Sequence, residues 1–369
     1  MIRVDIHTRE ISADTRIYVA RPGPNYKFFE LFVEGNFVGP DLPGLDLPPF
    51  ENLSDVGDLE ERVKRSVAIR RYALRGDRDI DPPMPHVADY ADVPSSRSIS
   101  QFLRVARAYF STMKVGDLII VPPANFRGLA HIGELAAAPN QLKQIYPRIY
   151  PETPLLGRHV IWRSVMEKAK LPAQTLDALQ KPSALFLLAR EAWPNVLRRA
   201  YGSYSMEGEY GARFEISSEK FQTTDDFFIQ AFFNFVSKNT DLVSTGSQDL
   251  LSLRDGAFAA EGVAPDLYTN VNSPGGLSLK SLVVTPIVIA VMLTLAITVG
   301  PAAFAAAEAG SLIFGNSQAP AGDQCTVEVS YQVVTQLRLL GYDRWSEACE
   351  VARAAAAKTG ISTTVGIGN

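Results

Sequence analysis

The middle of the chain carries an excess of basic side chains that could contact phosphate groups. The 369-residue sequence has a net charge of −4. Residues 95–200, however, hold 15 Lys and Arg against 6 Asp and Glu, and the segments on either side are acidic. This asymmetry favours a phosphate-bearing partner, although a solvated basic face that meets an acidic neighbour explains it equally well. The candidates for phosphate contacts are Arg97, Arg104, Arg107, Lys114, Arg127, Arg158 and Arg163.

None of the common residue patterns of catalytic or metal sites is found. The four histidines lie far apart, without the spacing of metal ligands. There is no phosphate-binding glycine loop, no dinucleotide fingerprint and no G-x-S-x-G elbow. Asp225 and Asp226 are adjacent, but neighbouring residues on a helix point apart, and two acids suit a helix N-terminus. The sequence therefore predicts no catalytic residues, no metal and no cofactor.

The longest apolar stretch, residues 281–307, has no charged residue between Lys280 and Glu308. Its first 19 residues would cover roughly 28 Å as a helix, about the thickness of a bilayer core. It also lacks the polar stripe of a surface helix. We therefore expect a single transmembrane helix, with a buried helix of a soluble core as the alternative. The polar start of the chain and Lys280 before the stretch place the N-terminal side in the cytoplasm.

Both cysteines, Cys325 and Cys349, follow the apolar stretch. If the stretch crosses a membrane, the two thiols share an oxidising side and could form a disulfide. Two unrelated buried thiols are the alternative.

The N-terminal half combines short strands with amphipathic helices. Strands are expected at Ile17–Ala20, near Phe37–Val38, at Leu118–Pro123 and at Leu129–Leu135, and helices within residues 53–74 and 98–110. Short turns between these strands predict a compact, strongly curved sheet with packed helices. The overall fold class is α+β.

Several of these segments, taken in order, carry a family resemblance. They are "IYVARPGPN", "ISQFLRVARAYFSTMKVGDLIIVPP", "AHIGEL", "RHVIWR" and "LPAQTLDAL". The series resembles the N-terminal domain of some Mrr-type restriction proteins, a PUA-like domain related to EVE domains. The resemblance covers about residues 16–192 and implies a small barrel that reads nucleic acid or a nucleotide, often through a pocket for a modified base. By position in the matching motifs, it implies pocket roles for Arg21, Gln101 and Phe102.

The sequence departs from that family after residue 200. Mrr-type proteins continue into a nuclease domain with a strand-borne Asp and a Glu-x-Lys pair, and no such arrangement follows here. We expect a reader domain at 1–192, a helical, aromatic-rich association region at 193–240 and a polar linker at 241–280. A transmembrane segment at 281–307 and a small C-terminal α/β region at 308–369 complete the expected organisation.

These patterns lead to a functional hypothesis with two alternatives. The leading one is a sensor tethered in the bacterial inner membrane by one span, which binds nucleic acid or a modified nucleotide and acts through the membrane, plausibly in anti-phage defence. It could also self-associate. The first alternative is a restriction-type nuclease with an unrecognised catalytic domain and a buried apolar helix. The second is a non-catalytic membrane adaptor that binds a protein.

Overall fold

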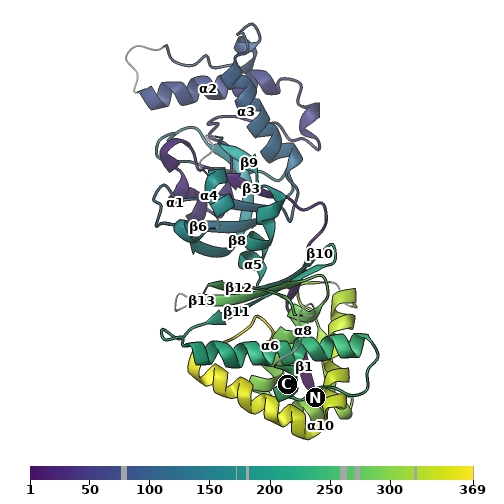
Figure 1. Cartoon of the computed structure of the whole chain (residues 1–369). Helices are drawn as coiled ribbons and strands as arrows, with labels where there is room; N and C mark the ends of the chain where they lie inside the picture. Colours follow the sequence, from purple (N-terminus) through teal and green to yellow (C-terminus); the bar gives the residue numbers. More distant parts are fainter. Residues whose placement is uncertain are drawn as a thin grey trace. The chain divides into compact units, whose positions relative to one another are not determined.

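The computed structural model divides the chain into two compact units, and the residues of one interrupt the sequence of the other. It describes residues 1–75, 81–171, 173–179, 183–257, 264–270, 275–319 and 322–368. Residues 14–196 form the insert unit, and residues 1–13 and 197–369 form the terminal unit (Figure 1). The insert unit therefore begins later than the expected first domain, 1–192. The first 13 residues belong to the same unit as the C-terminal half of the chain.

The insert unit is a mixed α+β unit built on a curled sheet. Its strands follow the order β4-β8-β6-β5-β3-β9, with β7 paired to β8, and the β3–β5 pair is parallel. The strands are β3 (Ile17–Ala20), β4 (Phe37–Val38), β5 (Leu118–Val121), β6 (Leu129–Leu135), β7 (Lys143–Ile145), β8 (Leu155–Glu167) and β9 (Leu185–Leu187). The helices are α1 (Phe29–Glu34), α2 (Leu59–Arg75), α3 (Arg97–Arg107) and α4 (Ala173–Leu179), and α5 (Trp193–Tyr201) crosses the boundary between the units. The strands expected at 17–20, 37–38 and 129–135 are confirmed.

The curl of this sheet depends on β8, which pairs with β6, β7 and β4 along its 13 residues. The β6–β8 register shifts between Ile132 and Gly133, and such irregularities bend a strand and increase its twist. Where β4 meets β8, a Cβ at Gly157 would overlap the Val38 carbonyl and the Phe37 ring. Glycine therefore permits the close approach that brings β4, and the chain after it, onto β8.

The terminal unit contains two sheets and a helical core. One sheet has the order β14-β1-β15 and the other β12-β13-β11-β10-β2. The strands are β1 (Ile2–Asp5), β2 (Thr8–Glu10), β10 (Ser203–Met206), β11 (Glu209–Ile216), β12 (Asp266–Asn270), β13 (Gly275–Ser281), β14 (Leu312–Gly315) and β15 (Gly366–Gly368). The helices are α6 (Thr223–Ser244), α7 (Leu253–Gly256), α8 (Thr285–Thr298), α9 (Ala302–Glu308) and α10 (Gln324–Thr359). β1 lies between β14 and β15, so both ends of the chain meet in one sheet (Figure 1).

The apolar stretch at 281–307 is not a single helix, which corrects the expectation of one transmembrane helix. Ser281 ends β13, and α8 and α9 follow, bent by 118° relative to each other across a short break. Gly300, with φ of 67°, lies in the break, where glycine adopts a conformation that other residues rarely do. No single helix in the described residues is long and apolar enough to cross a membrane, although the bent pair qualifies by length and composition.

Helix α8 lies in the core of the terminal unit. Residues Ile287–Met292 are completely buried, and α8 packs against β11, β13, α6 and α10. Burying each large aliphatic side chain contributes roughly 1.5–3 kcal/mol. Because other elements of the chain surround the helix, it needs no polar stripe, and its sequence looks the same as that of a lipid-facing helix.

One further expectation for the C-terminal half is corrected, and one open question is answered. The expected linker at 241–280 contains α7, β12 and β13, and β13 pairs with both β11 and β12. Of the two alternatives left open for Cys325 and Cys349, the structure has the second, because both are buried on α10 and both are free thiols. The aromatic helix near residue 225 is found as α6, where Phe232 and Phe235 are buried in the core.

Candidate functional site

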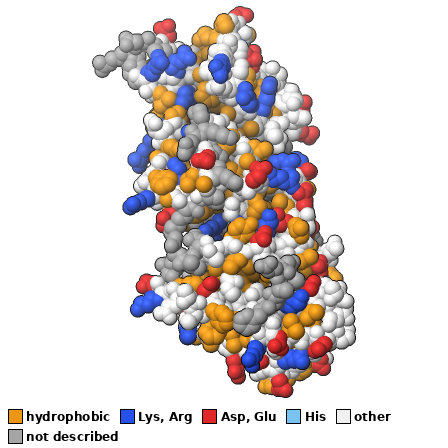
Figure 2. All heavy atoms as spheres, in the orientation of Figure 1, with side chains coloured by type: hydrophobic (Ala, Val, Ile, Leu, Met, Phe, Trp, Pro, Cys, Tyr) orange, Lys and Arg blue, Asp and Glu red, His pale blue; other side chains and the backbone are white. Residues whose placement is uncertain are grey.

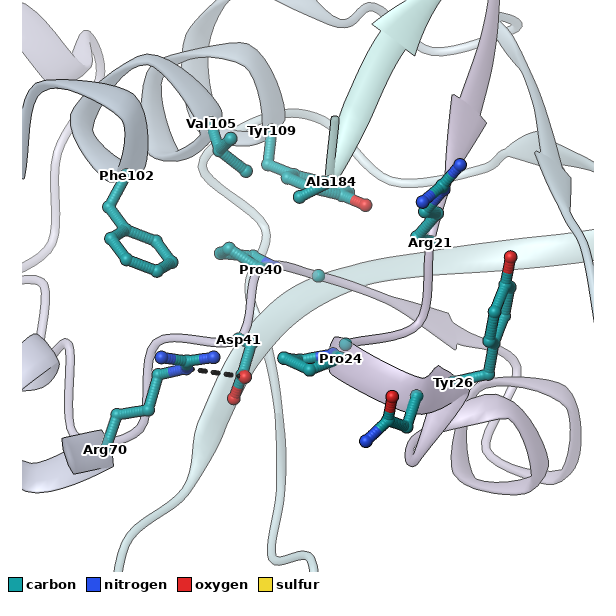
Figure 3. Close-up of a pocket in the computed structure, with 13 residues that line it drawn as sticks. Arg21, Pro24, Tyr26, Pro40, Asp41, Arg70, Phe102, Val105, Tyr109 and Ala184 are labelled. Atoms are coloured by element: carbon teal, nitrogen blue, oxygen red, sulfur yellow. Dashed lines mark hydrogen bonds and ion pairs between the residues drawn. The ribbon is translucent and has the colours of Figure 1, made fainter. Parts of the chain in front are cut away.

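The insert unit contains a pocket with a cavity of about 290 Å³ (Figure 3). This volume is at the lower end of the range for small-molecule sites. The walls come from the loop after β3, the loop after β4, helices α2 and α3, and the residue before β9. The lining residues are Arg21, Gly23, Pro24, Asn25, Tyr26, Gly39, Pro40, Asp41, Arg70, Phe102, Val105, Tyr109 and Ala184.

Helix α3 supplies one wall through Phe102 and Val105, with Tyr109 in the turn that follows it. Their spacing of three and four residues places the three side chains on one helical stripe. Leu103 and Ala106 lie on the neighbouring stripe of α3, which is buried in the core. The apolar residues of α3 are therefore divided between the cavity wall and the core.

The loop after β3 supplies the facing wall in an uncommon backbone conformation. Gly23, Asn25 and Tyr26 have φ values of 75°, 53° and 58°. A positive φ is unusual for a bulky residue such as Tyr26, and backbone strain of this kind is concentrated at functional sites. Figure 3 shows Arg21 and Tyr26 across the cavity from Phe102.

A buried carboxylate organises the floor of the pocket. The Asp41 side chain is 7% exposed, and its carboxylate accepts hydrogen bonds from Arg70 Nε at 2.7 Å and from the Tyr150 hydroxyl at 2.9 Å. Lys27 Nζ lies 3.1 Å from the same carboxylate. Burial lowers the pKa of Lys27 despite this partner, and burial together with Asp41 raises the pKa of Tyr150. Asp41 thus holds α2, the loop after β4 and two cations in one network.

Cations also lie against the aromatic walls. The Arg70 guanidinium is 5.4 Å from the centre of the Phe102 ring, and Lys168 Nζ is 5.3 Å from the centre of the Tyr26 ring. Arg21 donates to the Leu179 carbonyl, and its Nε is buried without a hydrogen-bond partner among the described residues. Burial, and secondly the nearby Arg21, lower the pKa of Lys168. The pocket therefore offers flat apolar surfaces beside positive charge.

The structure brings two of the sequence-predicted site residues together and separates the others from the pocket. Arg21 and Phe102 line it. Gln101, Arg97 and Arg104 lie on the exposed side of α3 and are absent from the pocket wall. Figure 2 shows basic side chains over the region of α2 and α3.

Of the remaining predicted phosphate contacts, Arg107 is exposed at the end of α3, and the others have different surroundings. Arg127 is exposed in the loop between β5 and β6, and Lys114 pairs with Asp14 at 3.5 Å. Arg163 pairs with the buried Glu134 at 2.8 Å. The phosphate role proposed for Arg158 is wrong, because this side chain is completely buried. It donates to the carbonyls of Ala137, Tyr109 and Met113, and so supports the fold instead.

Sequence reasoning missed Asp41, Arg70 and Tyr26. Asp41 follows a two-residue strand, and Arg70 belongs to a helix with several other basic residues, so neither is distinguished by its neighbours. The one local signal was the run Arg21-Pro-Gly-Pro-Asn-Tyr26, whose turn-forming residues indicate an irregular loop. Nothing in that run indicates what the loop faces.

The described residues contain no group of three or more His, Cys, Asp or Glu side chains arranged to hold a metal ion. Comparison with protein-family models, with curated proteins and with solved structures finds no match to this chain.

Proposed function

We propose that the insert unit is a PUA-like reader that binds a nucleobase, in a nucleotide or in nucleic acid, inside the pocket. The observation that carries this proposal is the position of two aromatic rings, Phe102 and Tyr26, on opposite walls of the cavity (Figure 3). Arg21 and Arg70 line the same cavity. Aromatic faces stack on bases, and arginine donates to base edges and phosphates. The size of the cavity suits one planar ring better than a large ligand.

The exposed side of α3 supports binding of a strand as well as of a free nucleotide. At about 100° per residue, Arg97, Gln101 and Arg104 fall on one stripe, and the pocket stripe of Phe102 and Val105 lies next to it. A strand whose phosphates follow the basic stripe would need to turn only one base toward the pocket. Extruding a single base costs a few kcal/mol, least for a single-stranded or damaged base.

The proposal is tested by fluorescence anisotropy with the full chain and labelled single-stranded oligonucleotides, unmodified and base-modified. The Phe102→Ala variant should weaken binding roughly tenfold, because stacking contributes about 1–3 kcal/mol per base. The matched control is Tyr146→Ala, which removes an exposed aromatic residue outside the pocket. Equal losses in both variants, or no binding of any oligonucleotide by the unmodified protein, would contradict the proposal.

The same samples test the alternatives. Salt-dependent binding favours phosphate contacts over a protein-binding adaptor, and Arg97→Gln with Arg104→Gln should reduce the salt dependence. Cleavage of the oligonucleotide on addition of Mg²⁺ or Mn²⁺ would favour the nuclease alternative.

The membrane part of the hypothesis is a separate proposal. It depends on the composition of residues 281–307 and on the bent pair of α8 and α9. Insertion would require α8 to leave its contacts with β11, β13, α6 and α10. Membrane fractionation of cells that express the full chain, followed by carbonate extraction, decides whether this segment holds the protein in a bilayer.

A further inference from the structure

The pocket in the insert unit has more positive charge than its own acid neutralises. Arg21 and Arg70 line the cavity, while Lys27 lies on Asp41 and Lys168 lies against Tyr26. Among the lining residues, all of which the structure describes, Asp41 is the one acid. The wall therefore has two arginines and one acid, and two lysines contact residues of the wall, Asp41 and Tyr26.

The hydrogen bonds of these cations divide them into two groups. Lys27 and Arg70 both contact Asp41, so its single negative charge is shared on that side. On the other side, Arg21 donates to the Leu179 carbonyl and Lys168 donates to the Pro123 carbonyl at 3.1 Å. Both acceptors are neutral. The charge excess is therefore concentrated beside Arg21 and Lys168, next to the Tyr26 ring.

Arg21 lies near enough to Lys168 to be the second cause, after burial, of its lowered pKa. Like charges at short range in a partly buried site repel one another, and each also loses solvation. The Nε of Arg21 has no partner among the described residues even though it is buried. A bound anion would supply that partner and would offset the repulsion between Arg21 and Lys168.

We propose that the pocket selects an anionic ligand, a nucleoside phosphate, with the phosphate at Arg21 and Lys168 and the base between Phe102 and Tyr26. This inference rests on the proposed function, because it assumes that a base occupies the pocket. The phosphate belongs either to a free nucleotide or to one unit of a strand. Both sources present the same chemistry to the pocket.

The test compares nucleosides with nucleotides by isothermal titration calorimetry on the full chain. The probes are adenosine, guanosine, cytidine and uridine, each with its 5′-monophosphate, and a pentanucleotide single strand. The monophosphates should bind at least tenfold more tightly than the nucleosides, as hydrogen bonds to charged groups contribute about 1.5–3 kcal/mol. Their affinity should fall with salt while that of the nucleosides stays constant.

Variants locate the phosphate. Arg21→Gln and Lys168→Gln should each weaken monophosphate binding roughly tenfold, and Lys168→Gln, which is outside the pocket wall, should leave nucleoside binding within twofold. The matched control is Arg75→Gln, an exposed residue of α2 outside the pocket wall. Circular dichroism and chemical denaturation establish whether each variant is folded. If Arg21→Gln does not fold, Lys168→Gln serves as the test.

The outcomes separate this inference from the proposed function. Nucleosides that bind as tightly as their monophosphates would overturn the inference while the pocket remained a base-binding site. Failure of nucleosides, monophosphates and pentanucleotide alike would overturn both. Binding of the monophosphates alone would support the inference with a free nucleotide as the source, and tighter binding of the pentanucleotide would support it with a strand.

Discussion

Arg70 Nε donates to Asp41 Oδ2 over 2.7 Å, which ties helix α2 to the loop after β4 at the edge of the pocket. The same guanidinium lies 5.4 Å from the centre of the Phe102 ring on α3. One ion pair therefore sets the relative position of three elements that are far apart in the sequence. The pocket depends on this pair, because each of the three elements contributes to its walls.

Replacing Asp41 should destabilise the insert unit. Asp41→Asn removes the charge that balances Lys27 and Arg70, and leaves two partly buried cations without their anion. We expect a loss of about 2–4 kcal/mol in the free energy of unfolding, measured by urea denaturation. Asp46→Asn, at a side chain that is 79% exposed, should change it by less than about 0.5 kcal/mol. Similar effects of both substitutions would show that the network carries little of the stability.

Truncating α8 should destabilise the terminal unit if the helix is a core element. Ile289 is completely buried in this helix, and Ile289→Ala should cost about 2–5 kcal/mol of unfolding free energy. The control Leu282→Ala removes an aliphatic side chain that is 79% exposed just before the helix. If Ile289→Ala were no more destabilising in detergent-free buffer than the control, the packing of α8 in this core would be disproved.

The two cysteines should be reduced and unreactive in the folded protein. Both thiols are buried, and burial raises the pKa of Cys325 and of Cys349 to about 12. Since the thiolate is the reactive form, reaction with a disulfide reagent at pH 8 should be slow in the native state and rapid in urea. The assay without reductant should give two thiols per chain in urea. Recovery of none would show a disulfide.

His131, whose ring lies against Phe29 and Trp162, should make the free energy of unfolding decrease in mild acid. Burial lowers the pKa of His131 below its ordinary value of 6.5, more than Glu30 raises it. The unfolded chain therefore binds the proton more readily, and stability decreases as the pH falls below about 6.5, by at most about 1.4 kcal/mol per pH unit.

This contribution is isolated by comparison with His131→Phe, which keeps an aromatic ring at the position. Urea denaturation of both proteins at pH 7.5, 6.5 and 5.5 should show the larger decrease in the protein that has the histidine. Parallel curves for the two proteins would mean that His131 takes no part in the pH dependence.

Local patterns in the sequence were sufficient for many of the elements. The all-buried strand at Ile17–Ala20, the strand at Leu129–Leu135 and the aromatic helix α6 each follow from the spacing of apolar residues over a few turns or pleats. The same patterns marked Phe102 as an aromatic residue on an amphipathic helix. Whether it faced the core or a cavity was left open, because both environments accept a partly buried aromatic ring.

Only the tertiary structure decided where the pocket lies and what the apolar stretch does. Asp41, Arg70, Phe102 and Ala184 meet because strand pairing and helix packing join segments that are distant in the chain, and no local pattern encodes those contacts. The pairing of β2 with β10 likewise places residues 1–13 in the terminal unit and makes residues 14–196 an insertion. The sequence alone predicted a first domain of residues 1–192, because it does not show this pairing. For α8, the hydropathy of the sequence shows only that its side chains prefer to leave water. A bilayer and a core made of β11, β13, α6 and α10 satisfy that preference equally, so only the neighbours of the helix could distinguish them.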